Sequence, residues 1–441
     1  MAVDVSARRR RDILDALRRG AVPSNGLDVL AVGLDRFTAA FDDDLDRVVS
    51  GGSVFKAIRG EYGAGKTFVT RWLAERAKRR GFAAAEVQIS ETETPLHRME
   101  TVYRRLVEAL TTEQFQPSAW RPVLDGWIFT LEEDVLSAGT VTEDDAEGLD
   151  RAVGELMERR LADISRSTPG FAAALRGYRS AVSRGDTTTA DGLAAWLSGQ
   201  PHVAATARRA AGVKGDLDHF GALSFLSGLL TVLRDSGHPG LLLVLDEVET
   251  LQRVRSDARD KALNALRQLV DDVYSGRFPG LYLVITGTPA FYDGPQGVQR
   301  LAPLAQRLAT DFGPDPRYDN PRATQIRLPG FTVDSLVELG NKVTALYAAA
   351  YGCPRVTAVV DASYVRDLAV ALTGRLGGQV GVVPRIFLKK LVADVLDRVE
   401  QFEDWDPRRD YALTLRPDEL SDVERNLLAG ASSASDIDLP M

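Results

Sequence analysis

The hydrophobic positions of the chain form a few short runs that are separated by long stretches with helical spacing. Leu241–Leu245 and Leu281–Ile285 are continuous apolar runs, which are typical of parallel strands covered on both faces. Val54–Ile58 and Ala83–Ile89 are further predicted strands, and Gln325–Leu328 is a weaker candidate for an edge strand. We therefore expect an α/β fold built on a parallel sheet.

Between about residues 100 and 238, apolar residues recur at helix spacing, as Leu149, Val153 and Leu156 do. An alternation of strands and helices would reach its next strand in far fewer residues. We therefore expect a mostly helical insertion whose tryptophans, Trp120, Trp127 and Trp196, fill its own core.

The same patterns divide the chain into four parts. Residues 1–50 form an N-terminal helical extension, with helices predicted over residues 8–19 and Asp28–Val49. Residues 51–330 form the core and contain the insertion. Residues 331–400 are predicted to be helical, and residues 401–441 form a C-terminal segment that ends in a flexible tail.

The composition narrows the possible partners. The chain has 441 residues and a net charge of −8, whereas proteins held to nucleic acid by bulk electrostatics are usually basic. Any nucleic-acid contact must therefore come from a local patch or from a partner. Cys353 is the only cysteine and the four histidines are scattered, which argues against a disulfide framework or a zinc cluster. No apolar run is long enough to span a membrane, and we expect a cytoplasmic protein with no membrane partner.

The strongest chemical signal follows the first predicted strand. This segment is an unbroken match to the phosphate-binding loop pattern and runs Gly60, Glu61, Tyr62, Gly63, Ala64, Gly65, Lys66 and Thr67, with Phe68 opening the next helix. Glycines let the backbone turn tightly so that its N–H groups point at a phosphate, and the helix N-terminus adds positive potential. Lys66 can reach the β- and γ-phosphates, and the Thr67 hydroxyl can bind Mg²⁺.

A second signal lies at the end of a buried strand. Asp246 and Glu247 follow the run Leu241–Leu245, so Asp246 is predicted to hold Mg²⁺ through water and Glu247 to polarise the water that attacks the γ-phosphate. Thr288 or Thr286, at the tip of the next strand, could orient that water. Glu249 lies nearby, and we interpret it as part of a solvated face.

The order of these motifs, followed by PLAQRL and QIRLPGFT, resembles AAA+ ATPases of the branch that includes origin-recognition and transposition-adaptor ATPases. The resemblance implies a three-layer P-loop NTPase core with a helical lid. It makes Thr288 the first sensor, Arg307 an arginine finger that acts on a neighbouring subunit, and Arg385 the lid arginine of the second sensor. A finger delivered from a neighbour implies a homo-oligomer.

Three longer segments of the sequence resemble a more specific family. Ala31–Phe37, Phe55–Phe68 and Ala85–Leu106 are similar to the BrxD-type ATP-binding protein of bacteriophage-exclusion (BREX) systems, and this similarity spans nearly the whole chain. It implies that ATP and Mg²⁺ are the cofactors and that the protein acts in phage defence. It also implies that double-stranded DNA and other BREX proteins, such as a helicase, are candidate partners.

Two functions agree with these features. The first is an ATP-hydrolysing motor or loader, and the alternative is a nucleotide-gated switch or scaffold that docks partners with little hydrolysis. Three basic stretches could contact DNA, namely Arg8–Arg11, Arg176–Arg184 and Arg208–Lys214. In the second of these, Tyr178 could stack on a base.

Overall fold

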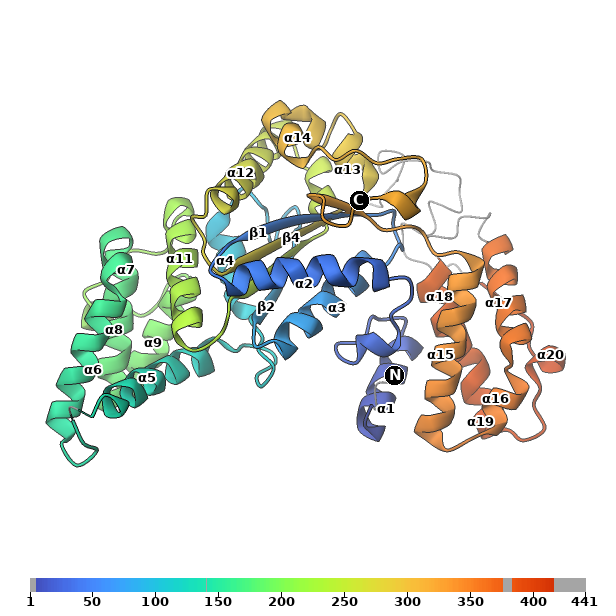
Figure 1. The fold of residues 1–441 in the computed structure, drawn as a ribbon, viewed down its shortest axis with the longest axis horizontal. Helices are drawn as coiled ribbons and strands as arrows, with labels where there is room; N and C mark the ends of the chain where they lie inside the picture. The colour runs from blue at the N-terminus through green and yellow to red at the C-terminus, as the bar shows by residue number, and fades with distance from the viewer. Residues whose placement is uncertain (1–4, 140, 376–382, 416–441) are drawn as a thin grey trace.

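The computed structural model describes residues 5–139, 141–375 and 383–415 and is built around a parallel five-stranded sheet (Figure 1). The strand order is β2-β3-β4-β1-β5, and every neighbouring pair is parallel. All carboxyl ends therefore meet at one edge. The predicted strands are confirmed as β1 (Val54–Arg59), β2 (Ala83–Gln88), β3 (Leu241–Asp246), β4 (Leu281–Gly287) and the short β5 (Gln325–Arg327).

Helices cover both faces of the sheet. Alternate strand residues such as Val54 and Ile58 pack with α2 (Asp35–Val49) and α3 (Lys66–Arg79) in one hydrophobic core. Residues that point the other way, such as Phe55, pack with α4 (Met99–Glu108), α11 (His219–Asp235) and α12 (Ser256–Tyr274). The fold is thus the expected three-layer α/β arrangement.

The N-terminal segment differs in part from the prediction. Helix α1 (Ala7–Arg18) lies where it was expected, but the helix predicted from Asp28 is a 3₁₀ turn, η1 (Leu27–Val29), and α2 begins only at Asp35. Gly33 lies between them with φ +70°, a left-handed conformation that ends a continuous helix.

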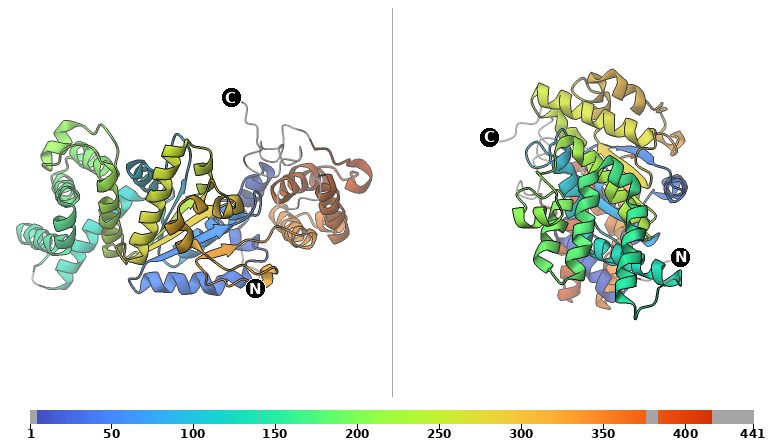
Figure 2. Two further views of the ribbon diagram at one scale, coloured as in Figure 1. Left: turned by 90° about the horizontal axis from the view of Figure 1, so that it is seen from above. Right: turned by 90° about the vertical axis from the view of Figure 1, so that its left-hand side faces the viewer.

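Apart from α4 and α11, the helices between β2 and β3 project to one side of the sheet (Figure 1; Figure 2, left). Their tryptophans are buried, as predicted, and their ring N–H groups are satisfied: Trp120 donates to the Ala194 carbonyl at 3.1 Å and Trp196 to the Gly215 carbonyl at 3.0 Å. Besides α4 and α11, this region contains α5 (Trp120–Ser137), α6 (Ala146–Arg160), α7 (Ala162–Ser167), α8 (Pro169–Ser183), α9 (Thr187–Leu197) and α10 (Ala205–Ala210).

A second group of helices lies at the opposite end of the molecule (Figure 1; Figure 2, left). It begins at Thr332, which caps α15 together with Ser335. We call this group the lid; helix α1 packs on it and shares its hydrophobic core. Its members are α15 (Val333–Tyr351), α16 (Arg355–Val359), α17 (Ala362–Arg375), α18 (Val383–Lys389), a π-helical turn η6 (Lys390–Leu396), α19 (Asp397–Gln401) and α20 (Pro407–Asp410).

Short elements complete the described chain. They are η2 (Val248–Gln252), α13 (Pro289–Asp293), η3 (Val298–Arg300), α14 (Ala302–Leu308) and η4 (Pro316–Tyr318). The predicted tail lies outside the described residues. No helix within the described ranges is both long enough and apolar enough to cross a membrane.

Candidate nucleotide-binding site

The glycine-rich loop joins β1 to α3 at the carboxyl edge of the sheet. Gly63 (φ +76°) and Gly65 (φ +88°) adopt left-handed conformations that disfavour side chains. Gly60 is needed for a different reason, because an added Cβ would lie 3.1 Å from the Cβ of Ala64 and 3.3 Å from that of Leu328. Helix α3 starts at Lys66, so its unpaired first N–H groups open toward the loop.

The ammonium group of Lys66 is folded back onto this loop. It donates to the Gly60 carbonyl at 2.9 Å and to the Glu61 carbonyl at 3.4 Å. It also lies 5.2 Å from the ring centroid of Tyr62 and 3.6 Å from Oε1 of Glu249. Lys66 is therefore a buried cation beside the loop that is shaped to hold phosphate.

Two hydroxyl side chains from different elements contact the Asp246 carboxylate. The Thr67 hydroxyl donates to Oδ2 of Asp246 at 3.0 Å, and the Thr286 hydroxyl donates to Oδ1. A hydroxyl beside a carboxylate suits Mg²⁺, which binds few protein oxygens and keeps the rest of its shell for water and phosphate. Thr67 and Asp246, the two predicted metal ligands, are thus adjacent and fit the ion.

The two threonines named as alternatives occupy different places. Thr286 contacts Asp246, and its hydroxyl also accepts the backbone N–H of Glu247 at 3.1 Å. Thr288 is 2% exposed, and its hydroxyl has no hydrogen-bond partner in the described part of the chain. The structure therefore connects Thr286, rather than Thr288, to the predicted metal ligand.

Glu247 lies directly after β3 in a left-handed conformation with φ +59°. Such a backbone costs a residue other than glycine about 1–3 kcal/mol and is often found at functional sites. The side-chain amide of Gln88 donates to Oε2 of Glu247 at 2.9 Å. Sequence reasoning missed Gln88, although it is the last residue of β2 and pairs in register with Asp246.

The interpretation of Glu249 as part of a solvated face is wrong. Glu249 is only 4% exposed, because the turn η2 carries it inward toward Lys66. Neither carboxylate oxygen has a hydrogen-bond partner among the described residues. Burial raises the pKa of Glu249, and the nearby Lys66 opposes that shift.

A cavity of about 520 Å³ is lined by Lys66, Thr67, Asp246, Glu247 and Glu249. Apolar side chains, among them Val22, Val32 and Phe331, also line the cavity and suit the planar ring of a nucleobase. Sequence reasoning assigned no binding role to the N-terminal residues here, since they lie far from the loop in sequence. The cavity also receives Tyr62, Gly63, Ala64, Gly65, Lys66, Thr67, Phe68, Asp246, Glu247, Glu249 and Arg385.

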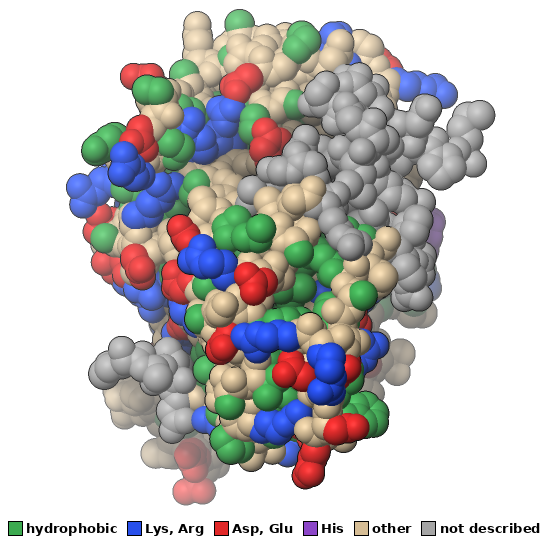
Figure 3. Space-filling view, turned by 90° about the vertical axis from the view of Figure 1, so that its right-hand side faces the viewer, with side chains coloured by type: hydrophobic (Ala, Val, Ile, Leu, Met, Phe, Trp, Pro, Cys, Tyr) green, Lys and Arg blue, Asp and Glu red, His purple; other side chains and the backbone are tan. Residues whose placement is uncertain are grey.

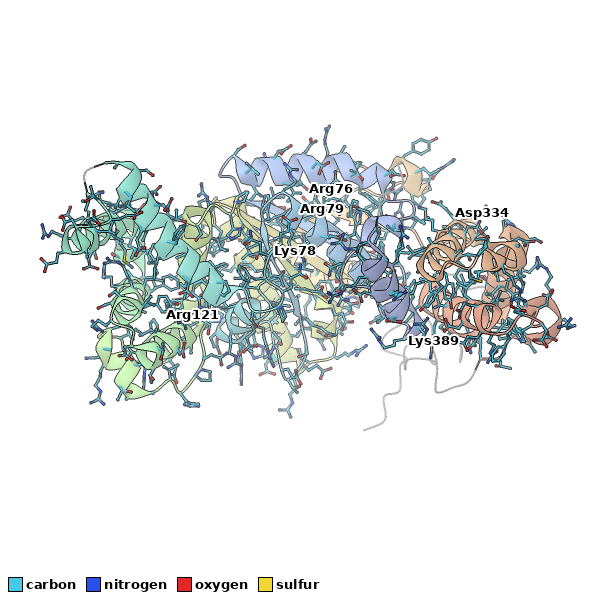
Figure 4. The ribbon with its side chains drawn as sticks, turned by 90° about the horizontal axis from the view of Figure 1, so that it is seen from below. Arg76, Lys78, Arg79, Arg121, Asp334 and Lys389 are labelled. Carbon is cyan, nitrogen blue, oxygen red and sulfur yellow. The ribbon has the colours of Figure 1, made fainter. Side chains whose placement is uncertain are left out.

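The two predicted arginines have different surroundings. Arg385 lines the cavity from α18, and an added Cβ at Gly20 would lie 3.5 Å from its Nη1. Figure 4 shows the next basic residue of α18, Lys389, beside α1. Arg307 lies on α14, is paired with Asp271 of α12, and does not line the cavity. Its action on a neighbouring subunit stays a prediction.

A parallel sheet with a glycine-rich phosphate loop and a strand ending in Asp-Glu defines an α/β P-loop NTPase. The sequence profile of the family described as "BREX system ATP-binding protein BrxC/D" matches residues 5–415. The chain therefore belongs to this family of ATP-binding proteins.

One similar solved structure is that of the ORC2 protein of Aeropyrum pernix, described as ADPNP-ADP complexes. The two chains are 11% identical with a TM-score of 0.35, and the match covers 81% of this chain and 66% of the other. The chain thus spans just under two thirds of that protein. A search of curated proteins finds no match.

Proposed function

We propose that the protein hydrolyses ATP in a Mg²⁺-dependent reaction and acts as an oligomeric motor or loader in DNA-linked phage defence. The observation that carries this proposal is the convergence of Lys66, Thr67, Asp246 and Glu247 on one cavity. When bound, Mg²⁺ would neutralise charge on the β- and γ-phosphates.

Each residue then has a distinct task. Lys66 binds the phosphates, and Thr67 and Asp246 hold the metal. Glu247 orients and polarises the attacking water, and Gln88 fixes its carboxylate until water and nucleotide are in place. Thr286 positions Asp246, whereas Arg385 contacts the phosphates from the lid. Arg307 would complete the site of a neighbouring subunit.

Steady-state ATP hydrolysis by the parent protein and by Glu247→Gln tests this proposal. We expect turnover to fall at least about 100-fold in the variant while ATP binding persists, because only the activation of water is lost. Lys66→Ala should lose binding as well. Exposed Glu143 provides a matched control, and Glu143→Gln should hydrolyse ATP at the parent rate. Equal turnover in Glu247→Gln would refute the assignment of the base.

The alternative function, a nucleotide-gated switch or scaffold, is favoured by one observation. The cavity lies between the sheet and a helical group that has its own hydrophobic core, so a nucleotide could set their arrangement without being hydrolysed. In that case the parent would bind ATP with negligible turnover, and its capture of partner proteins would require Lys66 but not Glu247.

The DNA contact is proposed to involve α1. In the insertion, Arg176 is paired with Glu158 and Arg179 with Asp150. Tyr178 is buried, so the idea that it stacks on a base is wrong. By contrast, the exposed residues Arg8, Arg9 and Arg11 of α1 have no ion pair in the described chain. On the face of the lid that Figure 3 shows, basic side chains are interspersed with acidic ones.

Duplex binding measured at several salt concentrations tests this contact. Replacing Arg8, Arg9 and Arg11 by Gln should weaken binding and reduce its salt dependence, because fewer phosphate counterions are released. Arg176→Gln and Arg179→Gln are the matched controls and should leave binding unchanged. An unchanged salt dependence in the α1 variant would place the DNA contact elsewhere.

A further inference from the structure

The cavity contains a buried carboxyl group beside Lys66 that the reaction above does not use. Glu249 is 4% exposed, and its only close charged partner in the described chain is Lys66, at 3.6 Å. That separation is longer than a hydrogen bond, and both carboxylate oxygens lack hydrogen-bond partners. A buried carboxylate with so little compensation is costly, so its presence needs an explanation.

A second unsatisfied polar group lies on α13, the helix that packs against the turn carrying Glu249. Tyr292 is 1% exposed, and its hydroxyl has no hydrogen-bond partner in the described chain. Its helix, α13, packs against the turn η2 that carries Glu249, and the Gln252 amide joins the two by donating to the Ala290 carbonyl at 3.0 Å. Burial raises the pKa of Tyr292 well above its ordinary value, and Glu249 raises it further. Tyr292 therefore keeps its proton and can donate a hydrogen bond to an acceptor.

We propose that Glu249 is a counter-ion that the nucleotide displaces: it holds Lys66 in the empty site and moves to the Tyr292 hydroxyl when phosphate takes Lys66. This inference rests on the proposed binding of ATP to this cavity. It assigns a role to both unsatisfied groups, since the Tyr292 hydroxyl can donate one hydrogen bond to the Glu249 carboxylate once the nucleotide is bound.

The proposal has a consequence for affinity. Phosphate and the Glu249 carboxylate compete for one ammonium group, and they repel each other when both are present. Glu249 therefore weakens nucleotide binding and favours release. The effect should be greater for ATP than for ADP, because the γ-phosphate adds negative charge near Lys66.

Equilibrium binding of ATP and ADP to the parent and to Glu249→Gln tests the competition. We expect the variant, which keeps the shape and loses the charge, to bind ATP about tenfold more tightly and to gain less for ADP. General damage to the site would weaken binding, so a gain in affinity is specific to the proposal. Equal or weaker ATP binding would overturn it.

The role of Tyr292 is tested by a double-mutant cycle. Tyr292→Phe removes the hydroxyl and should weaken ATP binding about threefold, but it should have no effect in the Glu249→Gln background. Tyr282 is the matched control, because it is equally buried and donates to Asp44 away from the cavity. An equal effect of Tyr292→Phe in both backgrounds would overturn the transfer to Tyr292.

Two further measurements keep the test decisive. Thermal unfolding without nucleotide shows whether each variant is folded. If Glu249→Gln is not folded, Glu249→Asp, which withdraws the charge by one methylene, must bind ATP more tightly than the parent. If the parent does not bind ATP, the proposed function itself is refuted. If the parent binds ATP but the variant binds it no more tightly, only this inference is refuted.

Discussion

The helical insertion and the lid are attached to the sheet in different ways. The core of the insertion runs without a break from Phe171 through Phe225 of α11 to Leu243 of β3. The lid and α1 share a separate core, and Phe68 is a contact between that core and the α2–α3 face of the sheet. Moving the insertion away from the sheet would expose the interior of a continuous hydrophobic core, whereas moving the lid away from the sheet would expose little apolar surface. We therefore expect nucleotide binding to be transmitted through the lid and α1.

The largest expected effect comes from creating a cavity in each of the two hydrophobic cores in turn. Phe171 and Phe387 are both fully buried, and replacing either with Ala should cost about 3–5 kcal/mol of stability. Because the insertion shares its core with the sheet, Phe171→Ala should accelerate hydrogen exchange of the β3 amides. Phe387→Ala should accelerate exchange in α15 and α1 and leave β3 unchanged. If hydrogen exchange of the β3 amides accelerated equally in both variants, the lid would share its core with the sheet as the insertion does.

The next effect concerns ATP itself. At about 100 times its Kd, a ligand that binds only the closed lid stabilises that state by about 2.7 kcal/mol. Hydrogen exchange at the start of α15, where Ser335 and Leu339 line the cavity, should then slow by up to about 100-fold. Exchange in α8 of the insertion should not change, and Lys66→Ala should abolish the protection. Equal protection of α8 would show that the insertion also responds to nucleotide.

The sequence predicted those features of the fold and the site that depend on a short stretch of consecutive residues. The apolar runs of β3 and β4 identified buried strands, and the glycine-rich loop identified the phosphate site, because its backbone needs particular residues at particular positions. Neither signal contains the strand order. The pairing of Gln88 with Glu247 depends on the register between β2 and β3, which the intervening helices obscure.

Two other features depend on contacts between distant segments. Glu249 is a polar residue in a turn, and in isolation such a residue is usually solvated. It is buried only because η2 packs under α13 and beside Lys66. The apolar lining of the cavity combines Val22 and Phe331, and no local pattern shows that these residues line the same cavity.

The smallest expected effect compares one ion pair from each helical region. Asp397 joins α1 to the lid: it accepts from Nε and Nη2 of Arg18 at 2.7 and 2.8 Å and from the Tyr347 hydroxyl at 2.8 Å. The hydrogen bonding that Arg18 donates to Asp397 is the main reason why the pKa of Arg18 is raised. In the insertion, Asp150 pairs with Arg179 but is 66% exposed. The two carboxylates therefore differ mainly in burial and in the number of donors.

Asp397→Asn should cost about 1–2 kcal/mol in denaturant unfolding, since solvent screens part of a charge-assisted pair that is only partly buried. It should also accelerate hydrogen exchange in α1, because that helix loses its polar attachment to the lid. Asp150→Asn should cost less than about 0.5 kcal/mol, as exposed pairs do. If the two substitutions cost the same, polar contacts would not attach α1 to the lid. Apolar packing through Leu14 and Leu17 would then be sufficient.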